Sequence, residues 1–402
     1  MQPAFFSLYG CLQRLVVLVF LTAGLCIGLW GPEPAAAAGT THVNRKAQTS
    51  AKKPQASLEE MAGQMIMVGF RGTGEDPLSE DLRLLLDDIR KGHIGGVILF
   101  DRDHLSKTPG RNIVSLDQTA RLVAKLQAAA PVPLFVAVDQ EGGRVRRLRE
   151  EHGASNTPSA REMGQGPTEA TFDQALRLGK TLRSVGINLD FAPSLDVDIN
   201  PLSPAIGALG RSFSADPAKV AAHGRAFARG LARAGVLFCY KHFPGHGSAT
   251  EDTHNGLTDI SSTWQKSELA PYRALLAAQP PAMVMIGHVV LRQKTGDLPA
   301  SLSRKAISGM LRRDLGWKGV VITDDLQMQA IDGQYSTRQA VKLAVLAGVD
   351  ILLFGNNLKH DPGEGGKIHA TLVDLVHSGE ISPKRIEESY KRIMKVKTGL
   401  SK

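Results

Sequence analysis

The sequence has 402 residues, of which 43% are hydrophobic and 22% are charged, and it contains only 3 cysteines. This composition excludes a disordered or collagen-like chain, and so few cysteines exclude a disulfide-stapled scaffold. The net charge of +9 is the one unusual value. It points to an anionic partner, which could be nucleic acid, anionic lipid or an acidic polymer.

The N-terminal segment has the pattern of a secretory signal peptide. An uncharged apolar run covers residues 15–30, Arg14 precedes it, and four alanines follow it at 35–38. The run is shorter than the ~20 residues that span a bilayer, so we expect cleavage after Ala38 and export to the periplasm or the medium. The alternative is an uncleaved segment that anchors the protein in a membrane.

Removal of residues 1–38 takes away one Arg and one Glu, so the net charge stays at +9. It also leaves Cys239 as the only cysteine, which we expect to be an inert core residue. Residues 39–56 are polar and basic, and this composition predicts a flexible linker. We therefore assign the folded domain to residues 57–402.

Short apolar runs alternate with longer amphipathic segments along this domain. The runs are too short for buried helices and mostly do not alternate, as expected for strands buried on both faces of a parallel sheet. They occupy residues 65–70, 95–100, 133–139, 187–193, 235–243, 282–289, 319–325 and 350–355.

The segments between these runs have helical spacing. Ile307, Met310, Leu311 and Leu315 share one helical face, and Ser382 with Pro383 supplies a cap and first turn for a C-terminal helix. About eight strands, each followed by a helix, predict a single (β/α)8 TIM-type barrel. A doubly wound open sheet is the alternative, but no G-x-G-x-x-G follows the first run.

Polar residues recur at the C-terminal ends of four of these runs. They are Asp139, Lys241 with His242, His288, and Asp324 with Asp325. The carboxyl ends of barrel strands converge on one mouth, where active sites lie, so four such ends favour a catalytic site over isolated structural ion pairs.

The segment 241–247, Lys-His-Phe-Pro-Gly-His-Gly, has the composition of an irregular loop that leaves a strand. Asp252 and His254 follow it and stand two residues apart, so on an extended loop their side chains share a side. A carboxylate beside an imidazole orients it and tunes its basicity, as in an acid/base pair.

These segments resemble glycoside hydrolase family 3, specifically its single-domain β-N-acetylhexosaminidases. The resemblance extends over residues 58–398, and its most specific part is the block from Lys241 to His254. The other matching segments are Asp139–Val145, Gly210–Phe213 and Ile322–Leu326.

The resemblance implies a retaining exo-β-N-acetylglucosaminidase that forms a covalent glycosyl-enzyme. In it Asp324 is the nucleophile and His254 is the general acid/base, assisted by Asp252. The resemblance also implies that five residues bind the N-acetylglucosamine unit: Asp139, Arg147, Arg211, Lys241 and His242. It implies no cofactor and no metal.

Several residues keep a second interpretation. Asp325 could be the nucleophile in place of Asp324, although neighbouring strand residues point opposite ways. Glu141 is expected to hold the Gly-Gly turn rather than to act in catalysis. Asp190 and Asp196 are expected to brace loops, and His246 and His288 to be hydrogen-bonded scaffold residues.

The sequence is compatible with three other functions. A zinc hydrolase on the same barrel could use His242, His246, His254, His288 and Asp324, although their spacing matches no standard zinc motif. A glycan-binding protein without activity is disfavoured, because the nucleophile and acid/base positions are filled. A nucleic-acid binder is disfavoured by scattered basic residues and only 5% aromatic residues.

We therefore predict a monomeric exported enzyme whose partner is a glycan containing N-acetylglucosamine, with no nucleic-acid partner. Peptidoglycan fragments are the expected substrate, and chitin-like oligomers are the alternative. An uncharged imidazole also tolerates an incoming phosphate, so the resemblance leaves hydrolysis and phosphorolysis both open. An anionic glycan would suit the charge of +9.

Overall fold

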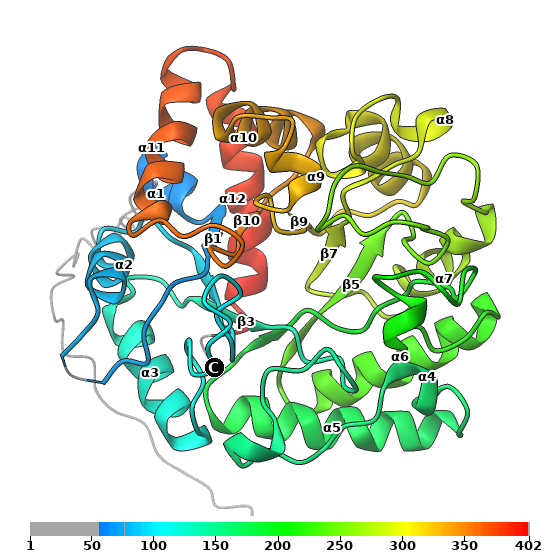
Figure 1. Ribbon diagram of the computed structural model, residues 1–402. Coiled ribbons are helices and arrows are strands. Elements are labelled where there is room, and N and C mark those ends of the chain that lie inside the picture. The colour runs from blue at the N-terminus through cyan, green and yellow to red at the C-terminus, as the bar shows by residue number, and fades with distance from the viewer. Residues whose placement is uncertain (1–55, 76, 401–402) are drawn as a thin grey trace, which may run out of the picture. The chain divides into compact units, whose positions relative to one another are not determined.

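Eight parallel strands form the centre of the fold in this computed structural model, which describes residues 56–75 and 77–400 (Figure 1). Their spatial order is β10-β1-β2-β3-β4-β5-β7-β9. They are β1 (Ile66–Val68), β2 (Gly96–Ile98), β3 (Phe135–Val138), β4 (Leu189–Asp190), β5 (Leu237–Phe243), β7 (Met283–Ile286), β9 (Val320–Thr323) and β10 (Leu352–Phe354).

The sheet closes on itself between β9 and β10. The Thr323 N–H donates to the Ile351 carbonyl at 3.1 Å, and the Ile351 N–H donates to the Val321 carbonyl at 3.0 Å. This closure rules out the open doubly wound sheet and confirms the predicted barrel. The strands are buried almost throughout, so the continuous apolar runs reflect contact with the barrel interior on one face and with helices on the other.

Helices surround the strands as an outer layer (Figure 1). The α-helices are α1 (Leu58–Gly63), α2 (Glu80–Arg90), α3 (Leu116–Ala129), α4 (Ala160–Met163), α5 (Thr168–Ser184), α6 (Pro217–Arg233), α7 (Ala270–Leu275), α8 (Arg292–Thr295), α9 (Gln329–Asp332), α10 (Thr337–Ala347), α11 (Glu364–His377) and α12 (Pro383–Lys397). Short 3₁₀ turns occupy η1 (Glu150–His152), η2 (Gly207–Leu209), η3 (Lys266–Leu269) and η4 (Ala300–Leu302).

Two local predictions need correction. The run at 187–193 contributes only the two strand residues of β4, because the chain turns away at Phe191-Ala192-Pro193. The helix predicted around Ile307 is present but is wound as a π-helix, η5 (Lys305–Asp314), and the Leu315 N–H bonds to the Met310 carbonyl five residues back. The wider winding still buries Ile307, Met310 and Leu311 and leaves Leu315 half-buried.

A second, small sheet was not predicted. It pairs β6 (Thr258–Asp259) with β8 (Val289–Val290). The run at 282–289 therefore splits between β7 in the barrel and β8 in this sheet. Two-residue strands have too little sequence pattern to be recognised.

The C-terminal helix α12 packs at the amino ends of the strands. The Ser382 hydroxyl caps it by accepting the Arg385 N–H, as its sequence predicts. The buried Lys397 ammonium donates to the Gln64 side chain at 2.6 Å and to the Gly95 carbonyl at 2.7 Å, just before β1 and β2. The opposite, carboxyl ends of the strands remain open for a site.

The signal peptide predicted for residues 1–38 lies outside the described residues, as does all but the last residue of the linker predicted for 39–56. Within the described ranges, no helix combines the length and the apolar character that a membrane crossing requires.

Candidate active site

A cavity of about 630 Å³ opens at the carboxyl ends of the barrel strands. Asp139 reaches it from the end of β3, Asp324 from the end of β9, and Asp252 with His254 from the loop after β5. Arg147 is the fifth predicted site residue that lines this cavity. The remaining three, Arg211, Lys241 and His242, lie behind this wall and contact residues that form it or stand next to it.

Asp324 offers one carboxylate oxygen to the cavity. Its Oδ1 atom accepts the Asp325 N–H at 2.8 Å, and its Oδ2 atom accepts no hydrogen bond within the described part of the chain. Burial alone would raise the pKa of Asp324, but its electrostatic interactions with the neighbouring histidines and the Asp325 N–H lower it. Asp324 is therefore an ionised carboxylate with a free oxygen.

Asp325 has a different environment. Its Oδ1 atom accepts the Gly355 N–H at 2.9 Å and the Gln327 N–H at 3.0 Å, so the carboxyl group ties the end of β9 to the end of β10. Burial raises the pKa of Asp325 to about 6. Two backbone N–H groups hold Oδ1, Oδ2 accepts no hydrogen bond in the described part of the chain, and burial disfavours the charge, which together suit a structural clasp better than a nucleophile.

The pairing of His254 with Asp252 is a second feature of the wall. His254 Nδ1 lies 2.8 Å from Asp252 Oδ1, while the backbone N–H of His254 donates to the same oxygen at 3.0 Å. The segment is thus a tight turn and not the extended loop expected from the sequence. Thr253 is buried at its centre, and the His254 ring is 53% exposed, with Nε2 free in the described structure.

This pairing sets the protonation of both side chains. The hydrogen bond from His254 lowers the pKa of Asp252 to about 2. Burial alone would lower the pKa of His254, but the hydrogen bond and charge of Asp252 raise it above its usual value. The imidazolium is therefore favoured, as a group that donates a proton requires.

Behind the wall, Lys241 joins two carboxylates. Its ammonium lies 2.8 Å from Asp139 Oδ1 and 2.6 Å from Glu141 Oε1, and its side chain is only 1% exposed. Burial alone would lower the pKa of Lys241, but Asp139 and Glu141 raise it. Arg147 contacts the other Asp139 oxygen at 3.3 Å.

Glu141 binds Arg211 as well as Lys241. Arg211 donates Nε to Oε2 at 2.9 Å and Nη2 to Oε1 at 2.7 Å, a bidentate pair. The Gly142 and Gly143 turn follows directly, but the carboxylate itself is used by these two cations. The prediction that Glu141 holds the Gly-Gly turn is therefore incomplete, since its side chain fixes Arg211 and Lys241.

His242 is held in one tautomer by its neighbours. Its Nδ1 atom lies 2.6 Å from Asp196 Oδ2, and its Nε2 atom lies 3.2 Å from Arg211 Nη2. Because a guanidinium only donates, Nε2 accepts and the proton resides on Nδ1. Asp196 therefore braces this residue, and Asp190 braces the neighbouring loop by accepting the Gln140 N–H at 2.9 Å.

The residues considered for zinc do not gather into a ligand set. His288 is occupied on both nitrogens, by Ser301 Oγ at 2.7 Å and the Asp325 carbonyl at 2.9 Å. His242 is likewise occupied by Asp196 and Arg211. Within residues 56–75 and 77–400, no three His, Cys, Asp or Glu side chains are arranged to hold a metal ion.

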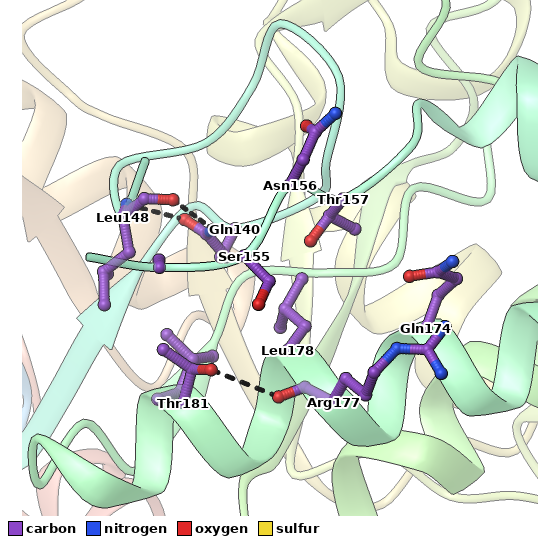
Figure 2. Close-up of a pocket in the computed structure, with 11 residues that line it drawn as sticks. Gln140, Leu148, Ser155, Asn156, Thr157, Gln174, Arg177, Leu178 and Thr181 are labelled. Atoms are coloured by element: carbon purple, nitrogen blue, oxygen red, sulfur yellow. Dashed lines mark hydrogen bonds between the residues drawn. The ribbon is translucent and has the colours of Figure 1, made fainter. Parts of the chain in front are cut away.

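Gln140 positions the loop that carries Arg147. Its side-chain carbonyl accepts the N–H groups of Arg147 at 2.7 Å and Leu148 at 3.0 Å, and its amide donates to the Leu148 carbonyl at 2.9 Å. Figure 2 shows the contacts with Leu148 above helix α5, beside a cavity of about 20 Å³ that also contacts Gln174. One buried amide thus fixes the backbone of a residue on the active-site wall.

We expect Gln140→Met to lower kcat/KM for an aryl N-acetyl-β-glucosaminide by up to about 10²-fold, because Arg147 loses the acceptor for its N–H and shifts. Gln174→Met is the matched control, since Gln174 contacts the same small cavity from α5 but its side chain makes no hydrogen bond in the described structure (Figure 2). Steady-state kinetics and thermal denaturation of both variants test this, and equal kinetic effects would contradict it.

One wall of the cavity was not predicted from the sequence. Arg102, His104, Lys107 and Arg149 line it, and the first three belong to the segment that follows β2. The signal was present, because polar residues also begin at the carboxyl end of this strand. This pattern was not recognised because Pro109 and Gly110 give the segment the composition of an ordinary surface turn.

Comparison with known proteins agrees with this geometry. Residues 57–396 match the family model described as glycosyl hydrolase family 3 N-terminal domain. The chain is 34% identical to β-hexosaminidase A of Pseudoalteromonas piscicida over 88% of its length. It is 38% identical to the β-hexosaminidase LpqI of Mycobacterium tuberculosis, over 76% of each chain.

A solved family 3 β-N-acetylglucosaminidase from Paenibacillus sp. FPU-7 superposes with a TM-score of 0.77 at 36% identity, over 86% of this chain. The chain spans 63% of the length of this structure and 63% of the Pseudoalteromonas relative. The match covers nearly all described elements of the barrel, and the chain belongs to glycoside hydrolase family 3, a family of glycosidases.

Proposed function

We propose that the protein is a retaining exo-β-N-acetylglucosaminidase that removes terminal β-linked N-acetylglucosamine through a covalent intermediate on Asp324. One observation carries the proposal. An ionised carboxylate with a free oxygen and a carboxylate-paired imidazole with a free Nε2 line the same cavity at the mouth of the barrel. The names of the relatives support the choice of sugar.

In the first step, Asp324 Oδ2 attacks the anomeric carbon while the bond from that carbon to the leaving oxygen breaks. His254 Nε2 gives its proton to the leaving oxygen, and Asp252 stabilises the imidazolium before the transfer. In the second step, water attacks the anomeric carbon, His254 accepts its proton, and the Asp324 carboxylate is released.

The remaining predicted residues bind and orient the sugar in this proposal. Asp139 and Arg147 stand on the cavity wall and offer an acceptor and donors to sugar hydroxyl groups. From behind the wall, Lys241 holds Asp139 and Glu141, and Arg211 holds Glu141 and contacts His242. We further propose that the enzyme is exported and acts on peptidoglycan fragments.

An assay on two aryl glycosides tests the sugar assignment. The protein should hydrolyse 4-nitrophenyl N-acetyl-β-glucosaminide far faster than 4-nitrophenyl β-glucoside, and NMR should show the β-anomer as the first sugar product. Preference for the glucoside would refute the substrate, and a first-formed α-anomer would refute the covalent mechanism.

The pH dependence tests the acid/base pair. Activity that needs protonated His254 falls as the pH rises through its pKa, which Asp252 raises. Asp252→Asn removes this charge, so the alkaline limb of the kcat/KM profile should move to lower pH. Asp259→Asn, which removes a surface carboxylate paired with Arg292, is the control and should leave the limb in place. An unmoved limb in Asp252→Asn would contradict the role of Asp252.

A further inference from the structure

Three neighbouring helices of the outer layer carry much of the protein's positive charge. Helices α5 and α6 lie side by side, and α7 packs against α6 (Figure 1). Together they contain eight cationic and two acidic side chains, a net charge of +6 out of the +9 of the whole chain. All eight cations are exposed, and we call them the α5–α7 basic face: Arg177, Lys180, Arg183, Lys219, Arg225, Arg229, Arg233 and Arg273.

None of these eight cations forms an ion pair within the part of the chain that the structure describes. The cations of helix α10, in contrast, are paired across to the next helix and the residues after it. Arg338 lies 2.5 Å from a carboxylate oxygen of Asp374, and Lys342 lies 2.7 Å from one of Glu380. The charge of the α5–α7 basic face is therefore available to an external partner.

Helix α6 shows that this charge does not serve folding. Its 17 residues include four cations and no acid. Arg225, Arg229 and Arg233 recur every four residues, so they lie on successive turns of one face and repel one another. Lys219 lies in the first turn, where the helix dipole also disfavours a positive charge. Acidic residues at some of these positions would stabilise the helix.

Glycines bring α5 and α6 into close contact. Gly230 of α6 faces α5, and a Cβ atom there would lie 2.6 Å from the Phe172 carbonyl oxygen. Gly179 of α5 faces the end of α6, and a Cβ atom there would lie 2.7 Å from the Cβ atom of Ala234. The two helices therefore present their cations on one continuous surface.

The surface between the cations of α6 consists of methyl groups. Its exposed residues other than the cations are Ala218, Ala222 and Ala232. Arg225 and Arg229 line a groove of about 440 Å³ whose other lining residues are five alanines and Thr168. Methyl groups let a partner approach closely, but they supply no hydrogen bond that distinguishes one anionic partner from another. This face therefore recognises charge.

The residue types on this face favour a surface of phosphate groups. Six of the eight cations are arginines, whose planar guanidinium groups match a phosphate with two parallel N–H donors. Because the cations are spread over three helices, they suit a two-dimensional array of lipid headgroups better than a single linear polymer.

Aromatic platforms for a polymer are lacking on these three helices, all of which the structure describes. Phe227 and Tyr272 are buried, and the partly buried Phe172 ring lies beneath the Arg229 guanidinium at 5.6 Å. No free aromatic ring therefore remains on which a base or a sugar could stack. This favours a lipid surface over a nucleic acid or a glycan.

We propose that the α5–α7 basic face binds the surface of a membrane that contains anionic phospholipids. Each basic residue near such a surface contributes about fivefold to binding. The attraction is electrostatic and requires no insertion of the helices, so salt weakens it. This binding goes beyond the proposed reaction and does not depend on it.

Co-sedimentation of the full chain with vesicles measures this binding. Wild type should bind vesicles of equal parts phosphatidylglycerol and phosphatidylcholine more tightly than vesicles of phosphatidylcholine alone, and added salt should reduce the difference. The α6 variant Arg225→Gln/Arg229→Gln/Arg233→Gln should bind the anionic vesicles at least about tenfold more weakly than wild type. Its unfolding midpoint should be no lower than that of wild type, because three mutually repelling charges are gone.

The control variant Arg304→Gln/Lys305→Gln/Lys318→Gln removes three exposed cations outside these helices. It should bind the anionic vesicles as tightly as wild type. Residues 1–56 are the same in every variant, so any contribution of that segment to binding is also the same.

The cations of α5 give a second test that does not depend on the folding of the α6 variant. The α5 variant Arg177→Gln/Lys180→Gln/Arg183→Gln should also bind the anionic vesicles at least about tenfold more weakly. Wild-type binding in both the α5 and α6 variants would overturn the inference, as would a wild-type protein that binds both kinds of vesicle equally.

Two further outcomes would also overturn the inference. An equal loss in the control variant would reduce the effect to overall charge. Weaker binding of the α5 and α6 variants to isolated peptidoglycan, with unchanged binding to vesicles, would identify an acidic glycan as the partner in place of a membrane.

Discussion

Asp324→Asn should lower kcat for 4-nitrophenyl N-acetyl-β-glucosaminide by at least about 10⁴-fold, because a carboxamide cannot form the glycosyl-enzyme. The replacement is isosteric, and its Oδ1 atom can still accept the Asp325 N–H. The unfolding midpoint should therefore stay close to that of wild type. Steady-state kinetics with thermal denaturation measures both quantities on one preparation.

Asp325→Asn is the matched control for this experiment. The amide oxygen can still accept the N–H groups of Gly355 and Gln327, so the clasp between β9 and β10 survives. The loss of activity should be far smaller than for Asp324→Asn. The reverse order of effects would assign the nucleophile to Asp325, the alternative that the sequence leaves open.

Glu141→Gln should lower the free energy of unfolding by about 3–5 kcal/mol, the usual cost of removing one partner from a buried ion pair. Glu141 is 5% exposed and compensates both Arg211 and Lys241, so its loss leaves two buried cations with less opposite charge. Urea denaturation gives the free energy directly. Activity should fall as well, because the same cations hold Asp139 and His242.

Glu150→Gln controls for the loss of a carboxylate at the surface, where the pair with Arg146 should contribute little to stability because water screens it. Equal destabilisation by both variants would refute the role given to Glu141.

The pH dependence of the free energy of unfolding tests the same role of Glu141. Burial would raise the pKa of Glu141, but Arg211 and Lys241 lower it to about 2.

The sign of this shift predicts acid lability. Because the folded state holds the Glu141 carboxylate more strongly than the unfolded state does, its contribution is complete above the unfolded pKa, about 4.3 for glutamate. It is lost as the pH falls towards 2. Wild type should lose more stability over this range than Glu141→Gln, which has no carboxylate there to protonate.

The barrel could be predicted because each strand is buried on both faces and therefore reads as an uninterrupted apolar run. The convergence of Asp139 and Asp324 followed from topology alone, since the carboxyl ends of parallel barrel strands meet at one mouth. The short β4, the β6–β8 pair and the π-helical winding of η5 were not predictable. Each of these features depends on tertiary packing and leaves no periodic pattern in the sequence.

Inside the site, a contact between residues close in sequence was predicted, whereas contacts between residues far apart in sequence were not. The meeting of Asp252 with His254 was predicted, because the partners are two residues apart. Glu141 was assigned to its own turn, although Arg211 lies 70 residues further along the chain and is brought to it only by the fold. Arg102 and Lys107 were missed for a similar reason, since only the folded barrel shows that they line the same cavity as His254.

The covalent intermediate on Asp324 can be measured directly in the variant His254→Ala. Nitrophenolate needs little help to leave, so Asp324 should still be glycosylated, whereas hydrolysis lacks its general base and the intermediate should accumulate. Mass spectrometry after a rapid quench should find one N-acetylglucosaminyl unit on the peptide that contains Asp324. No adduct, or an adduct on another carboxylate, would contradict the proposed mechanism.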